Sequence, residues 1–324
     1  MLTSVLLFAV GLVLLIKGGD WFVDGATGIA KRFNLPDIVV GATVVSIGTT
    51  LPEVMVSTTG ALQGSGAMAY GNAIGSIICN TALIAAISIT CNPGPVNTKS
   101  MKTPAIFFFC SAALYCLASY VLGTFPRWMG FVMLAIFVVY MITTVRNGLK
   151  NPDAAEEEEE ESGKERTLLM ELALLIIGAA VIAVGADLLV EHGQVIALGL
   201  GVPETVVALL FVALGTSLPE LVTTITSLRS GHASLGVGNV IGANVFNLVL
   251  VSGVAVSLAP FDVPMENELL NTGLNMSLVF EIPVMLGVMS LMIFPALLGK
   301  KLSRWQGVLL LGIYAAFCVC QFVL

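Results

Sequence analysis

Charged side chains are scarce in this chain. Asp, Glu, Lys and Arg make up 11% of its 324 residues, whereas hydrophobic residues make up 57%. The mean hydropathy is +0.97. Because a soluble domain typically carries about 25% charged residues, so few charges cannot cover the surface of a soluble protein of this length. The composition predicts a protein that crosses the membrane several times.

Patterns for metal binding, redox chemistry and catalysis are also missing. The only two histidines, His192 and His232, do not form an HExxH motif, which argues against a metalloprotease. None of the six cysteines forms a CxxC pair, so the sequence indicates neither a zinc site nor a redox motif. No constellation of nucleophile and base is visible either. We therefore expect no enzyme, no cofactor and no nucleic-acid partner.

Ten hydrophobic runs reach the roughly 20 residues that a helix needs to cross a membrane. They lie near 3–26, 36–63, 68–90, 104–122, 128–147, 168–190, 203–228, 234–258, 276–298 and 305–323. No Lys or Arg precedes Lys17, so the first run lacks the basic start of a cleavable signal peptide, and we expect it to be a retained helix. The runs predict an all-α integral membrane protein of ten transmembrane helices, surrounded by membrane lipid.

A six-residue phrase occurs twice, 167 residues apart, as Gly48-Thr49-Thr50-Leu51-Pro52-Glu53 and as Gly215-Thr216-Ser217-Leu218-Pro219-Glu220. Aligning 35–80 with 202–247 at this offset, without a gap, gives 16 identities in 46 positions. The chain is therefore an internal duplication, with repeat motifs at 36–83 and 203–250.

The duplication divides the chain into a first half, 1–147, and a second half, 168–324. Each half holds five spans, and because five is odd, the second half enters the membrane from the opposite side. The sequence thus predicts two inverted five-helix repeats, a plan typical of secondary transporters.

Basic residues predict the orientation of the chain in the membrane. If both termini are external, twelve of the fourteen Lys and Arg residues fall in cytoplasmic loops. Only Arg127 lies in an external loop, and Lys17 lies within the first span. The positive-inside rule therefore favours external N- and C-termini.

Residues 148–167 form a polar linker between the halves, on the cytoplasmic side in this orientation, and it contains six consecutive glutamates at 156–161. We interpret it as a solvated, self-repelling linker, because such a run lacks the spaced ligands and the glycine turn of a calcium loop. A cytoplasmic calcium sensor is the alternative.

Each repeated phrase ends in a glutamate inside an apolar run, where a charge costs roughly 2.5–3.5 kcal/mol or more. The spans offer almost no basic residue to pair with these two carboxylates. On a helix, the oxygen-bearing side chains of Ser46, Thr49, Thr50 and Glu53 fall on one stripe, and the matching stripe is Ala213, Thr216, Ser217 and Glu220. The matched carboxylates predict a cation site near the bilayer midplane.

Two further features add oxygen ligands to this site. Pro52 and Pro219 have no N–H to donate to the carbonyls of Gly48 and Gly215, so we expect helix breaks whose freed carbonyls coordinate a cation. The next run of each repeat places Ser76 with Asn80, and Ala243 with Asn247, one helical turn apart. Because all of these ligands are oxygens, they suit a hard cation such as Ca²⁺, which takes 6–8 of them.

The two GTxLPE segments, each followed by a GN-x2-G[SA]-x3-N segment, resemble the repeats of the cation/calcium antiporter superfamily. The chain is similar to the sodium/calcium exchanger branch, in its prokaryotic ten-helix form, over essentially its whole length. The resemblance implies an antiporter of the cytoplasmic membrane that exchanges Ca²⁺ for Na⁺ by alternating access. It also implies that the first helix of each half, 3–26 and 168–190, slides across a more rigid core.

The resemblance also implies the ligands of each ion. For Ca²⁺ these are Glu53 and Glu220 with the backbone oxygens of Thr49 and Thr216. For Na⁺ they are the same glutamates with Ser46, Thr50, Ser76, Asn80, Ala213, Ser217, Asn247 and the position of Ala243.

Two positions depart from the pattern of that branch, where Asp often replaces Asn247 and Ser often replaces Ala243. An Asn keeps a neutral oxygen ligand but removes a titratable one. The coupling ion therefore has alternatives, namely exchange of Ca²⁺ for H⁺ or a dependence on K⁺. The chain lacks the GNxxE-type motifs of the proton-coupled branch, which favours Na⁺. A cation channel lined by the same residues is the less favoured mechanism.

Overall fold

The computed structural model describes residues 2–150, 167–199, 215–263 and 275–323, and these residues are predominantly helical. In the first half the elements are α1 (Leu2–Arg32), α2 (Asp37–Val40), η1 (Gly41–Val45), α3 (Ser46–Thr49), α4 (Leu51–Leu62), α5 (Gly66–Cys79), η2 (Asn80–Ala85), α6 (Ala86–Cys91), β1 (Gly94–Pro95), α7 (Thr98–Cys116), η3 (Leu117–Leu122), β2 (Thr124–Phe125) and α8 (Arg127–Lys150), where η marks a π-helical turn.

In the second half the elements are α9 (Leu168–Gly199), α11 (Leu218–Arg229), α12 (Ala233–Phe246), η5 (Asn247–Val251), α13 (Ser252–Leu258), β3 (Phe261–Asp262), η7 (Ser277–Glu281), α14 (Ile282–Gly299), β4 (Lys301–Leu302) and α15 (Arg304–Val323). Several π-helical turns join two α-helices into one continuous span, as η2 joins α5 to α6 between Gly66 and Cys91.

The described residues include seven helices long and apolar enough to cross a membrane, or eight if the bent pair Asp37–Thr49 and Leu51–Leu62 counts as one span. The prediction of an all-α membrane protein is confirmed. Of the predicted span at 203–228, residues 203–214 lie outside the described residues, and 218–228 belong to α11. The last predicted span corresponds to α15. The count of ten spans stays a prediction.

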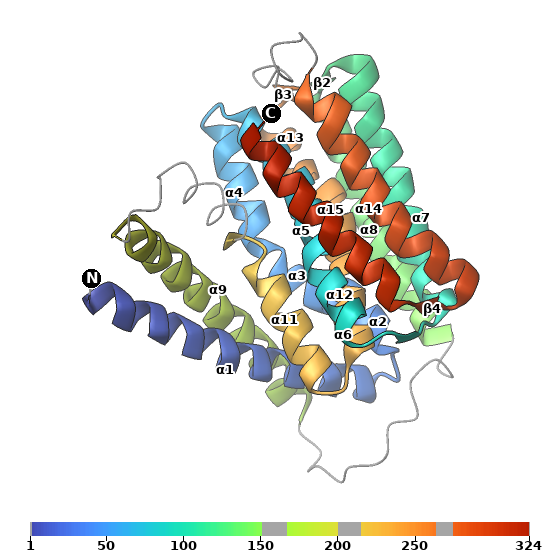
Figure 1. Ribbon diagram of the computed structural model, residues 1–324. Helices are drawn as coiled ribbons and strands as arrows, with labels where there is room; N and C mark the ends of the chain where they lie inside the picture. Colours follow the sequence, from blue (N-terminus) through green and yellow to red (C-terminus); the bar gives the residue numbers. More distant parts are fainter. Residues whose placement is uncertain (1, 151–166, 200–214, 264–274, 324) are drawn as a thin grey trace.

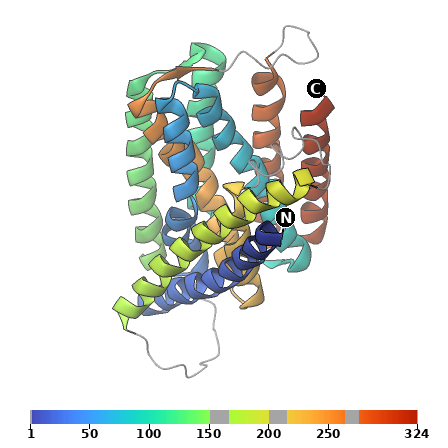
Figure 2. The ribbon, with the colours of Figure 1, turned by 90° about the vertical axis from the view of Figure 1, so that its left-hand side faces the viewer.

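The first helix of each half is longer than its hydrophobic run, and these two helices lie side by side in opposite directions. Figures 1 and 2 show α1 and α9 together, inclined across one side of the other helices. A Cβ on Gly11 would lie 2.9 Å from the Gly185 carbonyl oxygen, and a Cβ on Gly178 would lie 2.6 Å from the Phe22 amide nitrogen. Because no side chain fits between them, the two backbones are in direct contact.

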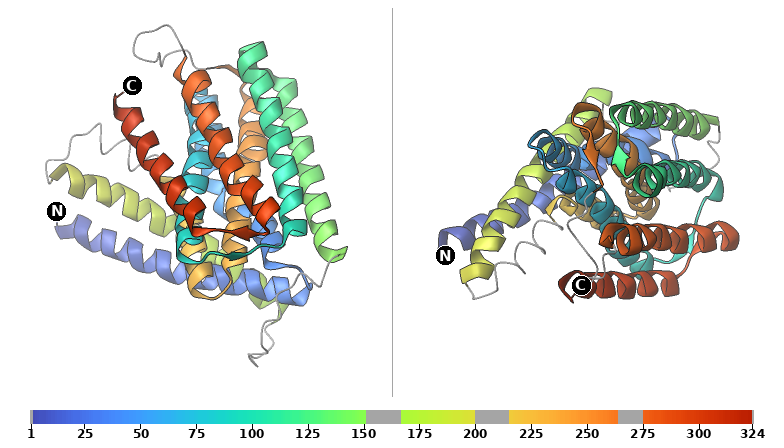
Figure 3. Two further views of the ribbon diagram at one scale, coloured as in Figure 1. Left: turned by 45° about the vertical axis from the view of Figure 1, so that its right-hand side comes forward. Right: turned by 90° about the horizontal axis from the view of Figure 1, so that it is seen from above.

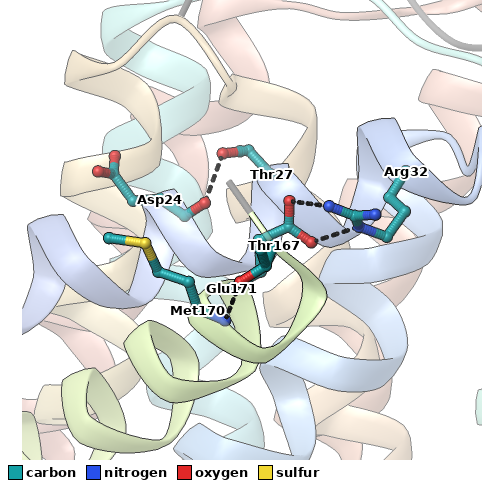
Figure 4. A network of polar contacts seen from close by, with 6 residues as sticks. All are labelled: Asp24, Thr27, Arg32, Thr167, Met170 and Glu171. Atoms are coloured by element: carbon teal, nitrogen blue, oxygen red, sulfur yellow. Dashed lines mark hydrogen bonds and ion pairs between the residues drawn. The ribbon is translucent and has the colours of Figure 1, made fainter. Parts of the chain in front are cut away.

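An ion pair ties α1 to α9 at one end. Arg32 Nε lies 2.9 Å from Glu171 Oε2, and Arg32 Nη2 lies 3.3 Å from Oε1, so the pair is bidentate (Figure 4). The absence of a side chain at Gly28 leaves room for Glu171, because a Cβ at Gly28 would lie 2.8 Å from Glu171 Cγ. The ion pair and the glycine contacts make α1 and α9 a single two-helix unit.

The remaining helices form an upright bundle beside this unit (Figure 3). The helix α12 lies inside the bundle, and nearly all of its residues are buried. A Cβ on Gly238 would lie 2.3 Å from the Ile38 carbonyl oxygen, so the backbone of α12 touches that of α2. Small residues at such contacts are typical of helix packing in membranes.

Short antiparallel strand pairs close the two ends of the bundle. β1 pairs with β4, and β2 pairs with β3. β3 lies 167 residues after β1, so these two strands are equivalent in the two repeats. In Figure 1 the pair β2–β3 is at the top and β4 is at the bottom, so equivalent strands lie at opposite ends. Gly64 and Gly231 are equivalent in the same way, and both have positive φ, 84° and 85°. Inverted repeats account for this arrangement.

Candidate cation site

The repeated phrase begins a helix in both halves, and in the first half it also interrupts one. α3 ends at Thr49 and α4 begins at Leu51, with a bend of 46° between the two parts of the span. α11 begins at Leu218, the position equivalent to Leu51. In each case a proline occupies the first turn of the new helix, where its missing N–H is no loss. The glutamate follows in the same turn.

The two glutamates are fully buried and close enough to repel each other. Both carboxylate oxygens of Glu53, and Oε2 of Glu220, have no hydrogen-bond partner in the described part of the chain. Thr50 Oγ1 lies 3.5 Å from Glu220 Oε1. The ion pairs of the described residues involve neither glutamate. The positive end of each helix dipole favours these negative charges, but it does not neutralise two buried carboxylates.

A π-helical turn begins at the equivalent asparagine of each half, Asn80 in η2 and Asn247 in η5. Within the described ranges, neither polar atom of the Asn80 amide has a hydrogen-bond partner, and Asn247 Oδ1 also lacks one. Asn247 Nδ2 donates to the Ala243 carbonyl at 3.1 Å. α11 packs against η2, and α4 packs against η5. Each glutamate-bearing helix therefore lies against the asparagine turn of the other half.

Hydroxyl groups at and near the helix breaks are the remaining oxygen groups of the candidate site. Ser217 is buried beside Cys79, and Ser76 is buried in α5 one turn before Asn80. Ser46 Oγ lies 2.8 Å from the Gly41 carbonyl oxygen and 2.9 Å from that of Asn239. Ala213, which we predict to be a position of a sodium site, lies outside the described residues.

Two asparagines that the sequence analysis did not include among the ligands connect the halves. Thr49 Oγ1 donates to Asn239 Oδ1 at 3.1 Å, and at the equivalent position Thr216 Oγ1 donates to Asn72 Oδ1 at 3.4 Å. Asn72 Nδ2 also donates to the Glu53 carbonyl at 3.2 Å.

On the other side, Asn239 Nδ2 donates to Thr223 Oγ1 at 3.1 Å, and that hydroxyl bonds the Pro219 carbonyl at 2.6 Å. Each asparagine thus links the threonine of one break to the glutamate-bearing helix of the other half. Their identity at the 167-residue offset was the signal in the sequence that could have found them.

The breaks face the α1–α9 unit. A Cβ on Gly48 would lie 3.0 Å from the Phe22 ring of α1, and a Cβ on Gly215 would lie 3.0 Å from Val190 Cγ2 of α9. A cavity of about 1130 Å³ adjoins this contact, lined by both breaks and by the middle of α9. Motion of the unit would therefore act directly on both breaks.

The donor set is hard and oxygen-based. Within the described ranges no three His, Cys, Asp or Glu side chains come together. The candidate site therefore offers two carboxylates, neutral amides and hydroxyls, and this set of donors suits Ca²⁺ or Na⁺ better than a soft metal. Buried oxygens without hydrogen-bond donors are what such a cation would satisfy.

Duplicated halves whose broken helices meet at two buried carboxylates define a secondary cation transporter. The family model described as sodium/calcium exchanger protein matches residues 3–146 and 170–323. The sodium/calcium exchanger MaX1 of Methanosarcina acetivorans is 30% identical over 352 residues, covering 98% of each chain. An uncharacterized membrane protein of Methanocaldococcus jannaschii, MJ0091, is 34% identical over 309 residues, covering 95% of this chain and 94% of its own.

A solved structure of the sodium–calcium exchanger NCX_Mj, soaked with Na⁺ and Sr²⁺, superposes with a TM-score of 0.80 at 31% identity, covering 98% of each chain. The chain belongs to the sodium/calcium exchanger family.

Proposed function

We propose that the protein exchanges Ca²⁺ for Na⁺ by alternating access across the cytoplasmic membrane. The observation that carries this proposal is the group of buried oxygens without donors around two unpaired glutamates at the helix breaks. Membership of the family and the named exchangers among its relatives support it.

The charge of the site explains competition between the two ions. Two ionised glutamates carry a charge of about −2, which one Ca²⁺ neutralises, or two Na⁺ ions at separate subsites. Simultaneous occupancy would place like charges together in a poorly screened region, where the repulsion is several kcal/mol. The ions therefore exclude each other. An empty site would leave two buried carboxylates unpaired. The unloaded protein should therefore interconvert only slowly between its inward-facing and outward-facing states.

Ligand roles follow from position. Glu53 and Glu220, with the backbone oxygens of Thr49 and Thr216, would hold Ca²⁺ between the halves. Ser46, Thr50, Ser76, Asn80, Ser217 and Asn247 would serve the Na⁺ subsites on either side. The amide oxygens of Asn80 and Asn247, which have no hydrogen-bond partner among the described residues, support this division.

The α1–α9 unit is the element that we propose to move. Its direct backbone contacts and the Arg32–Glu171 pair make it rigid, and it touches the bundle at Gly48 and Gly215. Small residues at both contacts permit sliding with little steric change. In the orientation that the basic residues favour, both termini are external and the acidic linker is cytoplasmic.

Transport in proteoliposomes tests the proposal. Purified protein is reconstituted into vesicles loaded with Na⁺ and diluted into medium free of Na⁺ and K⁺ that contains radiolabelled Ca²⁺. We expect uptake that requires internal Na⁺ and is lost when N-methylglucamine replaces it. The matched control variant is Asp262→Asn, which changes an exposed carboxylate outside the site.

Three outcomes would contradict the proposal. Uptake driven only by a pH gradient would indicate proton exchange. Uptake that needs K⁺ together with Na⁺ would indicate a K⁺-dependent exchanger. Flux that follows the Ca²⁺ gradient with no counter-ion would indicate a channel.

A further inference from the structure

One buried threonine beside the candidate cation site uses its hydroxyl to connect separate helices. A threonine hydroxyl in a helix commonly bonds a carbonyl one turn back, as Thr90 does with the Ala86 carbonyl at 2.7 Å. Thr81, the second residue of η2, instead bonds two other helices. Its hydroxyl accepts a hydrogen bond from Asn244 Nδ2 of α12 at 2.7 Å and donates to Met289 Sδ of α14 at 3.1 Å.

These three side chains form a closed polar group. Asn244 Nδ2 also donates to Met289 Sδ at 3.1 Å, so each side chain contacts the other two. All three are fully buried. Asn244 Oδ1 has no hydrogen-bond partner in the described part of the chain, so the contacts with Thr81 and Met289 orient this amide. The group therefore joins η2, α12 and α14 at one point.

The equivalent crossing of the other repeat is apolar. At the 167-residue offset Thr81 corresponds to Leu248 and Asn244 corresponds to Ile77, and both counterparts are fully buried. α5 packs against η5 as α12 packs against η2. The same architecture is therefore built from aliphatic side chains in one place and from a hydrogen-bonded pair in the other. Folding of such a crossing does not require the hydrogen bond.

The position of Thr81 connects this hydrogen bond to the candidate cation site. Thr81 directly follows Asn80, whose amide has no hydrogen-bond partner among the described residues. No hydrogen bond from these residues orients the Asn80 amide, so its place depends on where the backbone of η2 lies. The Thr81 hydroxyl ties that backbone to α12 and α14.

The asparagine turn of the second half is held by a different hydroxyl. Asn247 Nδ2 donates to the Ala243 carbonyl at 3.1 Å, and Ser252 Oγ donates to the Asn247 carbonyl at 2.8 Å. Ser252 corresponds to Ala85 in the first half, just as Thr81 has no hydroxyl counterpart in the second. Each asparagine turn therefore has its own supporting hydroxyl, at a position where the other turn is apolar.

We propose that Thr81 is a positioning residue for Na⁺: through its hydrogen bond with Asn244 it fixes η2 and so presents the Asn80 amide to a Na⁺ subsite. This inference rests on the proposed function, which assigns Asn80 to Na⁺ and the two glutamates to Ca²⁺. Among the described residues the Thr81 hydroxyl bonds α12 and α14, not α4 or α11, which carry the glutamates. Its loss should weaken Na⁺ binding and leave Ca²⁺ binding nearly unchanged.

Exchange in proteoliposomes tests this role. Uptake of radiolabelled Ca²⁺ is measured over a range of internal Na⁺ concentrations, and separately over a range of external Ca²⁺ concentrations. Thr81→Val removes the hydroxyl and keeps the shape of the side chain. We expect the Na⁺ concentration for half-maximal uptake to rise at least about fivefold, the factor that corresponds to one net hydrogen bond, while the KM for Ca²⁺ stays nearly unchanged.

Two matched variants separate positioning from a general loss of packing. Thr81→Ser keeps the hydroxyl and should retain the parental Na⁺ affinity. Thr90→Val makes the same change in the same span, at a hydroxyl that bonds its own helix, and should alter neither parameter. Because Thr81 and Asn244 act through one bond, the double variant Thr81→Val/Asn244→Leu should bind Na⁺ no more weakly than the weaker of its two single variants.

The proposal is overturned if Thr81→Val has the parental Na⁺ affinity, if it weakens Na⁺ and Ca²⁺ equally, or if Thr81→Ser is as impaired as Thr81→Val. Monodispersity and thermal unfolding verify that each variant is folded. If Thr81→Val does not fold, the double variant Thr81→Leu/Asn244→Ile, which copies the apolar pair of the other repeat, is judged by the first two criteria.

The parental protein is measured in the same vesicles. Uptake by the parent that does not depend on Na⁺ would contradict the exchange proposal itself. Normal exchange by the parent together with an unchanged Thr81→Val would contradict only the positioning role of Thr81.

Discussion

Replacing Glu53 with glutamine should weaken Ca²⁺ binding without lowering the stability of the ion-free protein. Neither Glu53 oxygen has a side-chain donor among the described residues, and the repulsion from Glu220 outweighs the compensation that the backbone at the helix start provides. A neutral amide of the same shape removes this repulsion. We therefore expect the ion-free variant to be at least as stable as the parent, which is unusual for a substitution at a buried polar position.

The loss of Ca²⁺ affinity can be estimated from charge. A unit charge pair 4 Å apart is worth about 4 kcal/mol at an effective dielectric constant near 20. Taking that as the minimum loss for a divalent ion, Kd should rise at least about 1000-fold. At a Ca²⁺ concentration about 100 times the parental Kd, binding stabilises the parent by about 2.7 kcal/mol. In the variant the same concentration falls to about a tenth of Kd, and the stabilisation nearly disappears.

Thermal unfolding with and without Ca²⁺ measures both effects on one sample. We expect the parent to show a large increase in Tm with Ca²⁺, and Glu53→Gln to show almost none while its Tm in chelator is not lowered. Asp262→Asn, an exposed carboxylate outside the site, should behave like the parent. A variant that keeps the full Ca²⁺-dependent increase would refute the assignment of Glu53. A variant with strongly reduced Tm in chelator would show that the carboxylate has a stabilising partner.

Three further predictions concern residues that stabilise the helices around the candidate site. Asn239→Ala should lower the free energy of unfolding by about 1–3 kcal/mol, because buried hydroxyls lose their amide partner, and chemical denaturation measures it. Gly238→Ala should cost about 1–3 kcal/mol or more, because its Cβ would lie 2.3 Å from a backbone oxygen, whereas Gly312→Ala, with nothing within 4 Å, should not destabilise. Arg32→Gln should leave Glu171 buried and unpaired and lower Tm, and Glu171→Gln in the same chain should restore part of the loss. Equal stability of the single and double variants would contradict the ion pair.

The repeated phrase was enough to place the important backbone features. Proline and glycine have local effects that do not depend on tertiary context, so the interruption before Pro52 and the one before Pro219 could be predicted from the sequence alone. The structure also has α11 beginning at the position equivalent to the start of α4. The membrane class followed equally directly, from hydropathy. Helix ends were less accessible, since α1 continues six residues beyond its hydrophobic run to the arginine that pairs with Glu171.

The hydrogen bonds that connect the two halves could not be predicted from the sequence in the same way. Asn72 and Asn239 are identical at the offset, but whether an amide faces a cation or a threonine of the other half depends on how the halves cross. That crossing follows from glycine contacts between distant backbones, as at Gly238 against Ile38. A helical stripe orders residues along one helix and gives no information about the helix opposite.

Both halves carry the motif glutamate, but two hydroxyl-bearing residues of the first half have no hydroxyl at the equivalent positions of the second half. This difference affects how ions are bound. Ser46 and Ser76 of the first half correspond to Ala213 and Ala243 of the second. A subsite that relies on the first-half hydroxyls therefore has no full counterpart, although the carboxylates are duplicated. In the proposed arrangement Ca²⁺, held by both glutamates, would depend on the symmetric part of the site, whereas Na⁺ would also depend on the asymmetric hydroxyls. Restoring a hydroxyl with Ala243→Ser should therefore tighten the apparent Na⁺ affinity in proteoliposomes while changing that for Ca²⁺ little. An equal change in both affinities would show that the hydroxyls serve the two ions together.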